Sequence, residues 1–215
     1  MNQTWYESKW HEYTGADLLR HLPDGSRSGR KARLAAVACI ERWSAASGSA
    51  LRANLLDLAL RLADGEASEP ERAEAYRAVP EQQTRDREEE NRVFHALLSV
   101  GGLQAGVEVL AALRVMWYTN ELTRRREAWA AYTVIIRDIF GNPFRIPAFD
   151  PNWRTSTAVA LSRQMYDSHE FSAMPILADA LQDAGCEHED ILDHCREAQA
   201  THVRGCWVVD LVLGK

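Results

Sequence analysis

The chain has 215 residues, of which 46% are hydrophobic and 26% are charged. This composition is ordinary for a globular protein with a sizeable core, and it excludes disorder as the main state of the chain. The net charge of −6 argues against a general nucleic-acid binder, because such proteins present a basic face to the phosphates. Local basic runs such as Arg124–Arg126 lie close to acidic residues, and we interpret them as solvated helix faces.

Residues 1–10 contain no apolar stretch of the kind found in secretory signals. The longest apolar run, Leu34–Ile40, is far too short to span a membrane. Four cysteines in a chain without a signal indicate free or metal-bound thiols in a reducing compartment. We therefore expect a soluble, cytoplasmic protein with no membrane segment.

Residues 1–66 are predicted to form a helical hairpin preceded by a short helix. Thr14 can cap a helix over Ala16–His21. A helix over Arg30–Ala45 is followed by a turn at Ser47 and Gly48, and Gly65 ends the second helix. The second helix is indicated by leucines on one helical face, at Leu51, Leu55, Leu58 and Leu62.

Residues 67–140 are predicted to contain polar helices and one long central helix. The segment Glu66–Arg92 is rich in Glu, Arg and Ala, and its alternating charges favour an exposed helix with i,i+4 pairs. Gly101 and Gly102 interrupt this pattern, and a long amphipathic helix is then expected over Leu103–Phe140. Its apolar stripe carries Tyr118, Leu122, Trp129, Tyr132, Ile136 and Ile139. Such a stripe is typical of helix–helix packing.

Residues 141–215 are predicted to form a loop followed by a helical block. Three prolines within residues 141–153 exclude a helix interior there. Its apolar side chains predict a loop packed against the helices: Phe144, Ile146, Phe149 and Trp153. Helices are expected over Thr155–Ser168, over Pro175–Asp183, from about His188 onward, and over Cys206–Leu213. The last segment has the valines of a strand, but nothing else in the chain offers a strand to pair with it.

These elements predict an all-α protein. We expect a single domain over residues 1–215 with about eight to ten helices, in which helical hairpins pack around the long central helix.

Cysteine and histidine are concentrated near the C-terminus. Three of the four cysteines and three of the seven histidines fall within residues 186–206. Thiolates and imidazoles are the ligand types of zinc. The candidate metal ligands are Cys186, His194, Cys195, His202 and Cys206. Neighbouring positions on a helix point about 100° apart, so His194 and Cys195 are not expected to bind the same ion.

Two other interpretations of this cluster stay open. The cysteines can be small buried apolar residues, with His194 and His202 at helix ends. Alternatively, Cys206 and His202 can form the nucleophile and base of a thiol enzyme. Burial of Cys206 in the apolar last segment would, however, raise the pKa of its thiol and make it inert.

Six short stretches of the sequence carry a resemblance to one protein family. They are Arg30–Cys39, Arg137–Arg145, Tyr166–Asp167, Pro175–Cys186, Asp190–Arg196 and His202–Lys215. On these strings the chain resembles a large family, common in planctomycete-type bacteria, that has no established activity. The family often has a Gly-Pro turn before its last string, whereas this chain has Glu-Ala-Gln-Ala-Thr, so this connection is expected to differ. The resemblance implies a bacterial, cytoplasmic, helical protein and assigns no functional residue.

The sequence contains no P-loop, Rossmann glycine pattern, nucleophile elbow, H-E-x-x-H or EF-hand loop. It does contain seven tryptophans, which favour large buried areas or contact surfaces. We therefore predict a non-enzymatic interaction module or accessory subunit of a bacterial assembly, with a protein partner and no catalytic or cofactor-binding residues. The first alternative is a small zinc-binding protein that uses the C-terminal cluster. A more remote alternative is a thiol-dependent enzyme.

Overall fold

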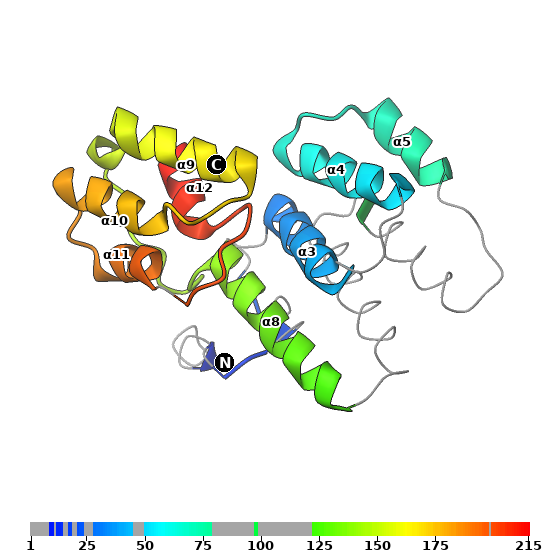
Figure 1. The fold of residues 1–215 in the computed structure, drawn as a ribbon, viewed down its shortest axis with the longest axis horizontal. Coiled ribbons are helices and arrows are strands. Elements are labelled where there is room, and N and C mark those ends of the chain that lie inside the picture. The colour runs from blue at the N-terminus through cyan, green and yellow to red at the C-terminus, as the bar shows by residue number, and fades with distance from the viewer. Residues whose placement is uncertain are drawn as a thin grey trace. The chain divides into compact units, whose positions relative to one another are not determined.

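The structure is a computed structural model, and it describes residues 9–10, 12–14, 17–18, 21–23, 28–44, 50–78, 97–98, 122–197 and 199–215. These residues form eight α-helices and one short 3-10 helix, and none of them lies in a strand (Figure 1). The all-α prediction is confirmed. None of the helices formed by these residues has the length and apolarity needed to cross a bilayer.

Two compact units make up the chain, and the boundary between them falls between Ile136 and Arg137, inside helix α8 (Leu122–Phe140). The predicted single domain over residues 1–215 stays a prediction. Residues 103–121 of the predicted long helix, residues 79–92 of the predicted polar helix and half of the short helix Ala16–His21 lie outside the described residues.

The N-terminal unit contains the predicted hairpin. Helix α3 (Gly29–Ser44) packs against α4 (Ala50–Asp64), and α4 also contacts the short polar helix α5 (Glu69–Ala78). An ion pair of 3.0 Å joins Arg30 near the start of α3 to Asp64 at the end of α4, so the two helices run antiparallel. Gly65 has a φ of 74° and ends α4, as predicted. Their contact faces bury Leu34, Val37, Ile40, Leu55, Leu58 and Ala59.

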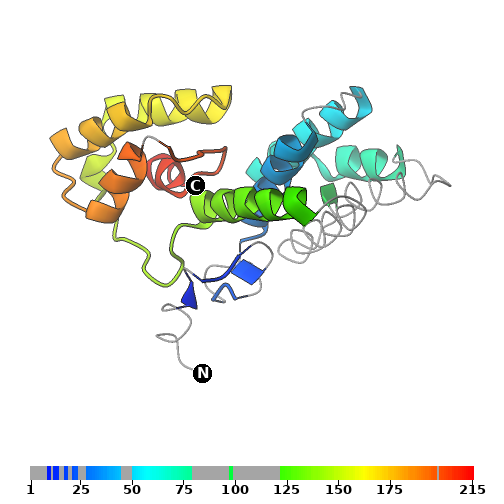
Figure 2. The ribbon, with the colours of Figure 1, turned by 60° about the horizontal axis from the view of Figure 1, so that its bottom comes forward.

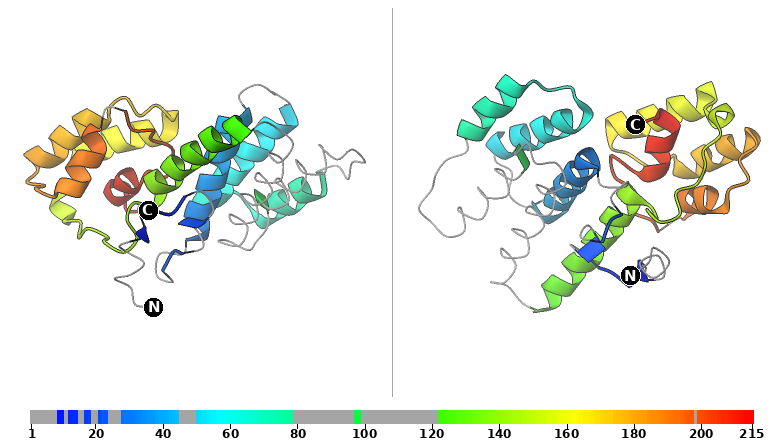
Figure 3. Two further views of the ribbon diagram at one scale, coloured as in Figure 1. Left: turned by 90° about the horizontal axis from the view of Figure 1, so that it is seen from below. Right: turned by 180° about the vertical axis from the view of Figure 1, so that it is seen from behind.

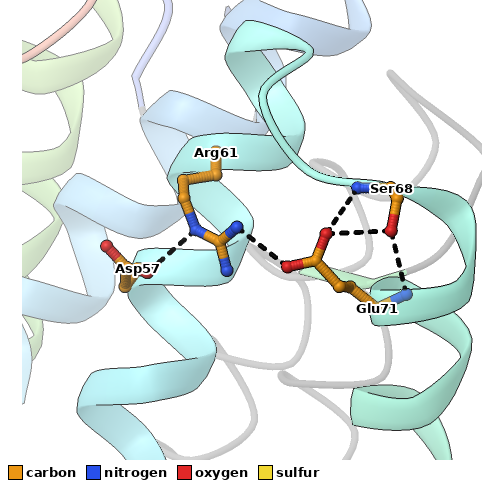
Figure 4. A network of polar contacts seen from close by, with 4 residues as sticks. All are labelled: Asp57, Arg61, Ser68 and Glu71. Carbon is orange, nitrogen blue, oxygen red and sulfur yellow. Dashed lines mark hydrogen bonds and ion pairs between the residues drawn. The ribbon is translucent and has the colours of Figure 1, made fainter.

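A capping box begins α5 (Figure 4). The Ser68 hydroxyl accepts from the Glu71 backbone N–H at 3.4 Å, and the Glu71 carboxylate accepts from the Ser68 backbone N–H at 2.9 Å. Arg61 of α4 donates to Glu71 at 3.0 Å, and this hydrogen bond connects α4 to α5. Arg61 also donates to Asp57 of its own helix at 3.1 Å.

The C-terminal unit begins in the last turn of α8 and ends at α12 (Trp207–Leu213). Between them lie the 3-10 helix η3 (Pro151–Trp153) and the helices α9 (Ser156–Ser168), α10 (Met174–Asp183) and α11 (Glu189–Arg196). Figures 2 and 3 show α12, in red, beside α9 and α11 and next to the end of α8. The helical prediction for the last apolar segment is confirmed.

The loop 141–150 packs only in part as predicted. Phe149 and Trp153 lie against the core of the C-terminal unit, with their rings 5.3 Å apart. Ile146, which was expected to pack as well, is 65% exposed. Pro147 follows Ile146 and biases it toward extended backbone, in which successive side chains point to opposite sides.

Helix α12 is held in place by its buried face and by contacts at its C-terminal end. Its seven residues are too few for an isolated helix to be stable, so tertiary contacts must stabilise it. Val208, Val209 and Val212 bury one face in the core. At its C-terminal end the guanidinium of Arg154 donates to the carbonyl oxygens of Leu211 and Val212 at 2.9 to 3.3 Å. Positive donors at this end also interact favourably with the helix dipole.

Protonation of Glu71 is expected to weaken the start of α5. Hydrogen bonds from the Ser68 backbone, Arg61 and the Ser68 hydroxyl lower the pKa of Glu71 to about 2. Since an unfolded glutamate has a pKa of about 4.3, the contribution of this group is fully present above that value and is lost as the pH falls toward 2. The difference in unfolding free energy between wild type and Glu71→Gln, measured with urea, should therefore shrink between about pH 6 and pH 2.5. A constant difference would contradict the cap, and the exposed Glu66→Gln is the matched control.

Removal of the Arg154 side chain is expected to destabilise the C-terminal unit. Arg154→Ala leaves the last carbonyls of α12 without this donor, and we expect a loss of about 1 kcal/mol in unfolding free energy. Arg163→Ala, at an exposed arginine of the neighbouring α9, is the matched control and should cost less. Denaturant unfolding of the two variants measures the difference, and equal losses would show that the carbonyl contacts add nothing.

Candidate metal centre

Four side chains from three segments of the C-terminal unit converge on one point. Asp138 comes from the last turn of α8 and His194 from α11. His202 precedes α12, and Cys206 is its N-cap residue. One donor atom from each residue lies within 4.8 Å of the other three, so this group can hold a metal ion.

Four of the six separations between the donor atoms are known individually. The Asp138 Oδ1 atom is 2.8 Å from His202 Nδ1 and 3.3 Å from His194 Nε2. The Cys206 Sγ atom is 3.2 Å from His194 Nε2 and 3.9 Å from His202 Nδ1. A tetrahedral zinc ion with ligands at about 2.0–2.3 Å places neighbouring donor atoms about 3.3–3.6 Å apart. These four separations differ from the tetrahedral values by about half an ångström or less, and the other two pairs of donor atoms lie within 4.8 Å.

The Asp138 carboxylate is oriented by the backbone. Its Oδ2 atom accepts from the N–H of Val203 at 2.9 Å, which leaves Oδ1 facing the two imidazoles. Burial by itself would raise the pKa of Asp138, but hydrogen bonds and charges of His194 and His202 outweigh it and lower that pKa. The carboxylate is therefore charged at neutral pH and available as a ligand.

The group is buried beneath aromatic side chains. The exposed side-chain fraction is 3% for Asp138, 6% for His202 and 18% for His194, and Cys206 is fully buried. The Trp207 ring lies 5.1 Å from the His194 ring, and the Phe171 ring lies 6.3 Å from that of His202. An apolar shell of this kind limits access of water to a metal site.

The geometry differs from that of a thiol enzyme. A nucleophile–base–acid triad uses both nitrogens of one imidazole, one toward the nucleophile and the other toward the carboxylate. Here the same atom, His194 Nε2, faces both Cys206 and Asp138. Burial and the charge of Asp138 also raise the pKa of the Cys206 thiol well above its usual value, although the amides of Val209 and Val208 oppose the rise. Such a thiol is a poor nucleophile unless a cation stabilises its anion.

Three of the five predicted ligands meet in this group: His194, His202 and Cys206. The other two, Cys186 and Cys195, are buried in the apolar core and are not members of it. Burial, with the charges of Cys186 and Asp138, raises the pKa of Cys195 to about 12. The expectation that His194 and Cys195 point in different directions agrees with these positions, because one faces the donor group and the other the core.

Asp138 was missed because it lies 64 residues before His202. Two signals in the sequence could have pointed to it. It is the one carboxylate among the apolar residues Ile135, Ile136, Ile139 and Phe140, which indicates a buried acid that needs a partner. It also belongs to Arg137–Arg145, one of the strings on which the family resemblance depends.

Comparison with known proteins returned no match for this chain among family models, curated proteins or solved structures. The resemblance to a bacterial family therefore stays an expectation, and the function has to be argued from the site.

The four cysteine thiols are expected to be unreactive in the folded protein. All four are buried, and burial raises the pKa of Cys39 and Cys206 well above the usual value. A colorimetric disulfide reagent at pH 7 should titrate four thiols only after unfolding in guanidinium chloride with a chelator. One thiol that reacts within seconds in the native protein would instead support the thiol-enzyme interpretation.

Proposed function

We propose that the protein binds one zinc ion through Asp138, His194, His202 and Cys206, and that this ion stabilises its C-terminal unit. The role is structural, in a non-enzymatic helical protein. The observation that carries the proposal is the convergence of four donor atoms from three segments, with four of their six separations close to those of a tetrahedral shell.

The donor set favours zinc over other common ions. Calcium and magnesium prefer shells made of oxygen, whereas this group has two imidazoles, a thiolate and a carboxylate. Iron–sulfur clusters and cuprous ions prefer several sulfur ligands, and only Cys206 supplies one here. Zinc accepts this mixture in tetrahedral geometry.

Charge balance supports a divalent cation. A zinc ion with an ionised Asp138, an ionised Cys206 and two neutral imidazoles forms a group with zero net charge. Burial of such a neutral group costs much less than burial of an uncompensated anion. The raised pKa of Cys206 describes the thiol without a cation, and a bound metal ion deprotonates a coordinating thiol.

The closed donor set supports a structural role. Four protein ligands complete a tetrahedron, whereas a catalytic zinc site keeps one position open for water or substrate. Helices α11 and α12 have only eight and seven residues, so neither is stable by itself. An ion that connects both of them to the end of α8 supplies the stability that their own length does not.

A role in protein interaction is compatible with this proposal and stays the prediction made from the sequence. Two large apolar side chains of the C-terminal unit, Ile146 and Ile176, are 65% and 58% exposed. They give a protein partner apolar surface to contact, but they do not define its chemistry.

Protein purified without chelator is expected to contain about one zinc per chain by elemental analysis. Removal of the metal with EDTA should lower the melting temperature by about 10 °C or more, since a ligand at a thousand times its Kd contributes about 4 kcal/mol. Less than about a tenth of an equivalent after exposure to zinc, with no effect of EDTA, would overturn the proposal.

Paired variants separate ligands from neighbours of the same type. Cys206→Ala and His194→Ala should lose stoichiometric zinc. Cys186→Ala removes an equally buried thiol, and His188→Ala removes a histidine at the start of the same helix, and both should keep the metal. Asp138→Asn should weaken zinc binding by at least about tenfold, because it removes the negative charge and keeps the shape. Zinc retained by Cys206→Ala would exclude this donor set.

A further inference from the structure

We infer that Trp207 controls the exchange of the metal, by covering the one ligand through which water and competing chelators reach it. This inference rests on the proposed zinc site and deepens it: the four ligands define where the ion binds, and Trp207 determines how long it stays.

The ligands differ in their access to solvent. Asp138, His202 and Cys206 are 3%, 6% and 0% exposed, whereas 18% of the His194 side chain is exposed. For a buried ion to leave, one bond to a ligand must break while a donor atom from solvent takes that position. Among the four ligands, His194 is where such a donor can approach. With zinc bound, the bond from the metal to His194 Nε2 would be the first to break, and its electron pair would return to the imidazole.

Trp207 lies against this ligand. Its ring centroid is 5.1 Å from that of His194, at an interplanar angle of 52°. Trp207 is the first residue of α12 and follows the ligand Cys206 directly, so its backbone is fixed close to the metal. Its side chain is partly buried against the core of the C-terminal unit. His194 therefore cannot swing away from the metal without displacing the indole or breaking this contact.

Gly141 fixes the other contact of the indole. A Cβ atom at this position would lie 3.0 Å from Cγ and 3.1 Å from Cδ2 of Trp207, so the ring packs directly on the backbone. Gly141 follows Asp138 by three residues and ends α8 with a φ of 62°. The indole thus contacts the segment that carries one ligand and the side chain of another, and follows a third in the chain.

The test measures the rate at which zinc passes from the loaded full-length protein to a chromogenic chelator in excess. Trp207→Ala should release zinc at least about tenfold faster than wild type. Its zinc content should stay at one equivalent, and its cobalt-substituted form should keep the thiolate charge-transfer band. Trp207→Phe, which keeps an aromatic ring beside His194, should restore most of the slow release.

Trp153→Ala is the matched control. It also removes a partly buried tryptophan that packs against the core of this unit, but the ring of Trp153 lies against that of Phe149. Its release rate should stay within about twofold of wild type. Equal acceleration in the two alanine variants would overturn the inference, because it would indicate general loosening of the unit. An unchanged rate in Trp207→Ala would overturn it as well.

Two further results keep the inference testable. If Trp207→Ala fails to fold, the series Trp207→Phe and Trp207→Leu takes its place, and release should become faster as the ring is first reduced and then lost. Equal rates in that series would overturn the inference. A wild-type protein that holds no zinc overturns the proposed function itself, whereas normal zinc content with a rate independent of Trp207 overturns this inference alone.

Discussion

The buried carboxylate of Asp138 joins three segments of the C-terminal unit. Asp138 is almost fully buried, and a buried anion is tolerated only where partners surround it. Its partners are the Val203 amide and the imidazoles of His194 and His202, which come from the connection before α12 and from α11. The hydrogen bonds that the Asp138 carboxylate accepts therefore bring the end of α8 together with two later segments. The thiol of Cys206 lies beside them because Cys206 is the N-cap residue of α12.

The helices around this point are too short to hold their positions independently. Helices α11 and α12 gain stability from packing, and α12 in particular is tied at each end. Cys206 connects its start to the donor group, and Arg154 holds the carbonyl oxygens of its last turn. The same Arg154 guanidinium lies over the Phe149 ring, so the apolar loop after α8 helps to place it. In this way the donor group and the loop together fix the helix from which Trp207 projects.

Periodicity predicted the helices well because each apolar stripe is a local property of the sequence. The hairpin of α3 and α4, the stop at Gly65 and the helical state of the last segment were all expected. The exposed position of Ile146 was not expected, because the composition of a loop shows how apolar it is and not which side chain faces inward. For the site, clustering of residue types found His194, His202 and Cys206 but could not exclude Cys186 and Cys195. Asp138 required a contact across 64 residues, and nothing local encodes that distance.

The arrangement of nitrogen atoms gives the strongest argument for a metal over the alternatives. If the imidazoles served only as helix caps, they would face backbone carbonyls, and a relay of protons would use both nitrogens of one ring. Instead each ring directs one nitrogen toward the same carboxylate oxygen and the same sulfur. Without a cation, the Cys206 thiol stays protonated beside the Asp138 carboxylate in a region that excludes water. In the proposed zinc-bound form, a divalent ion between them would stabilise the thiolate and balance both negative charges, and the Trp207 ring against His194 would slow its departure.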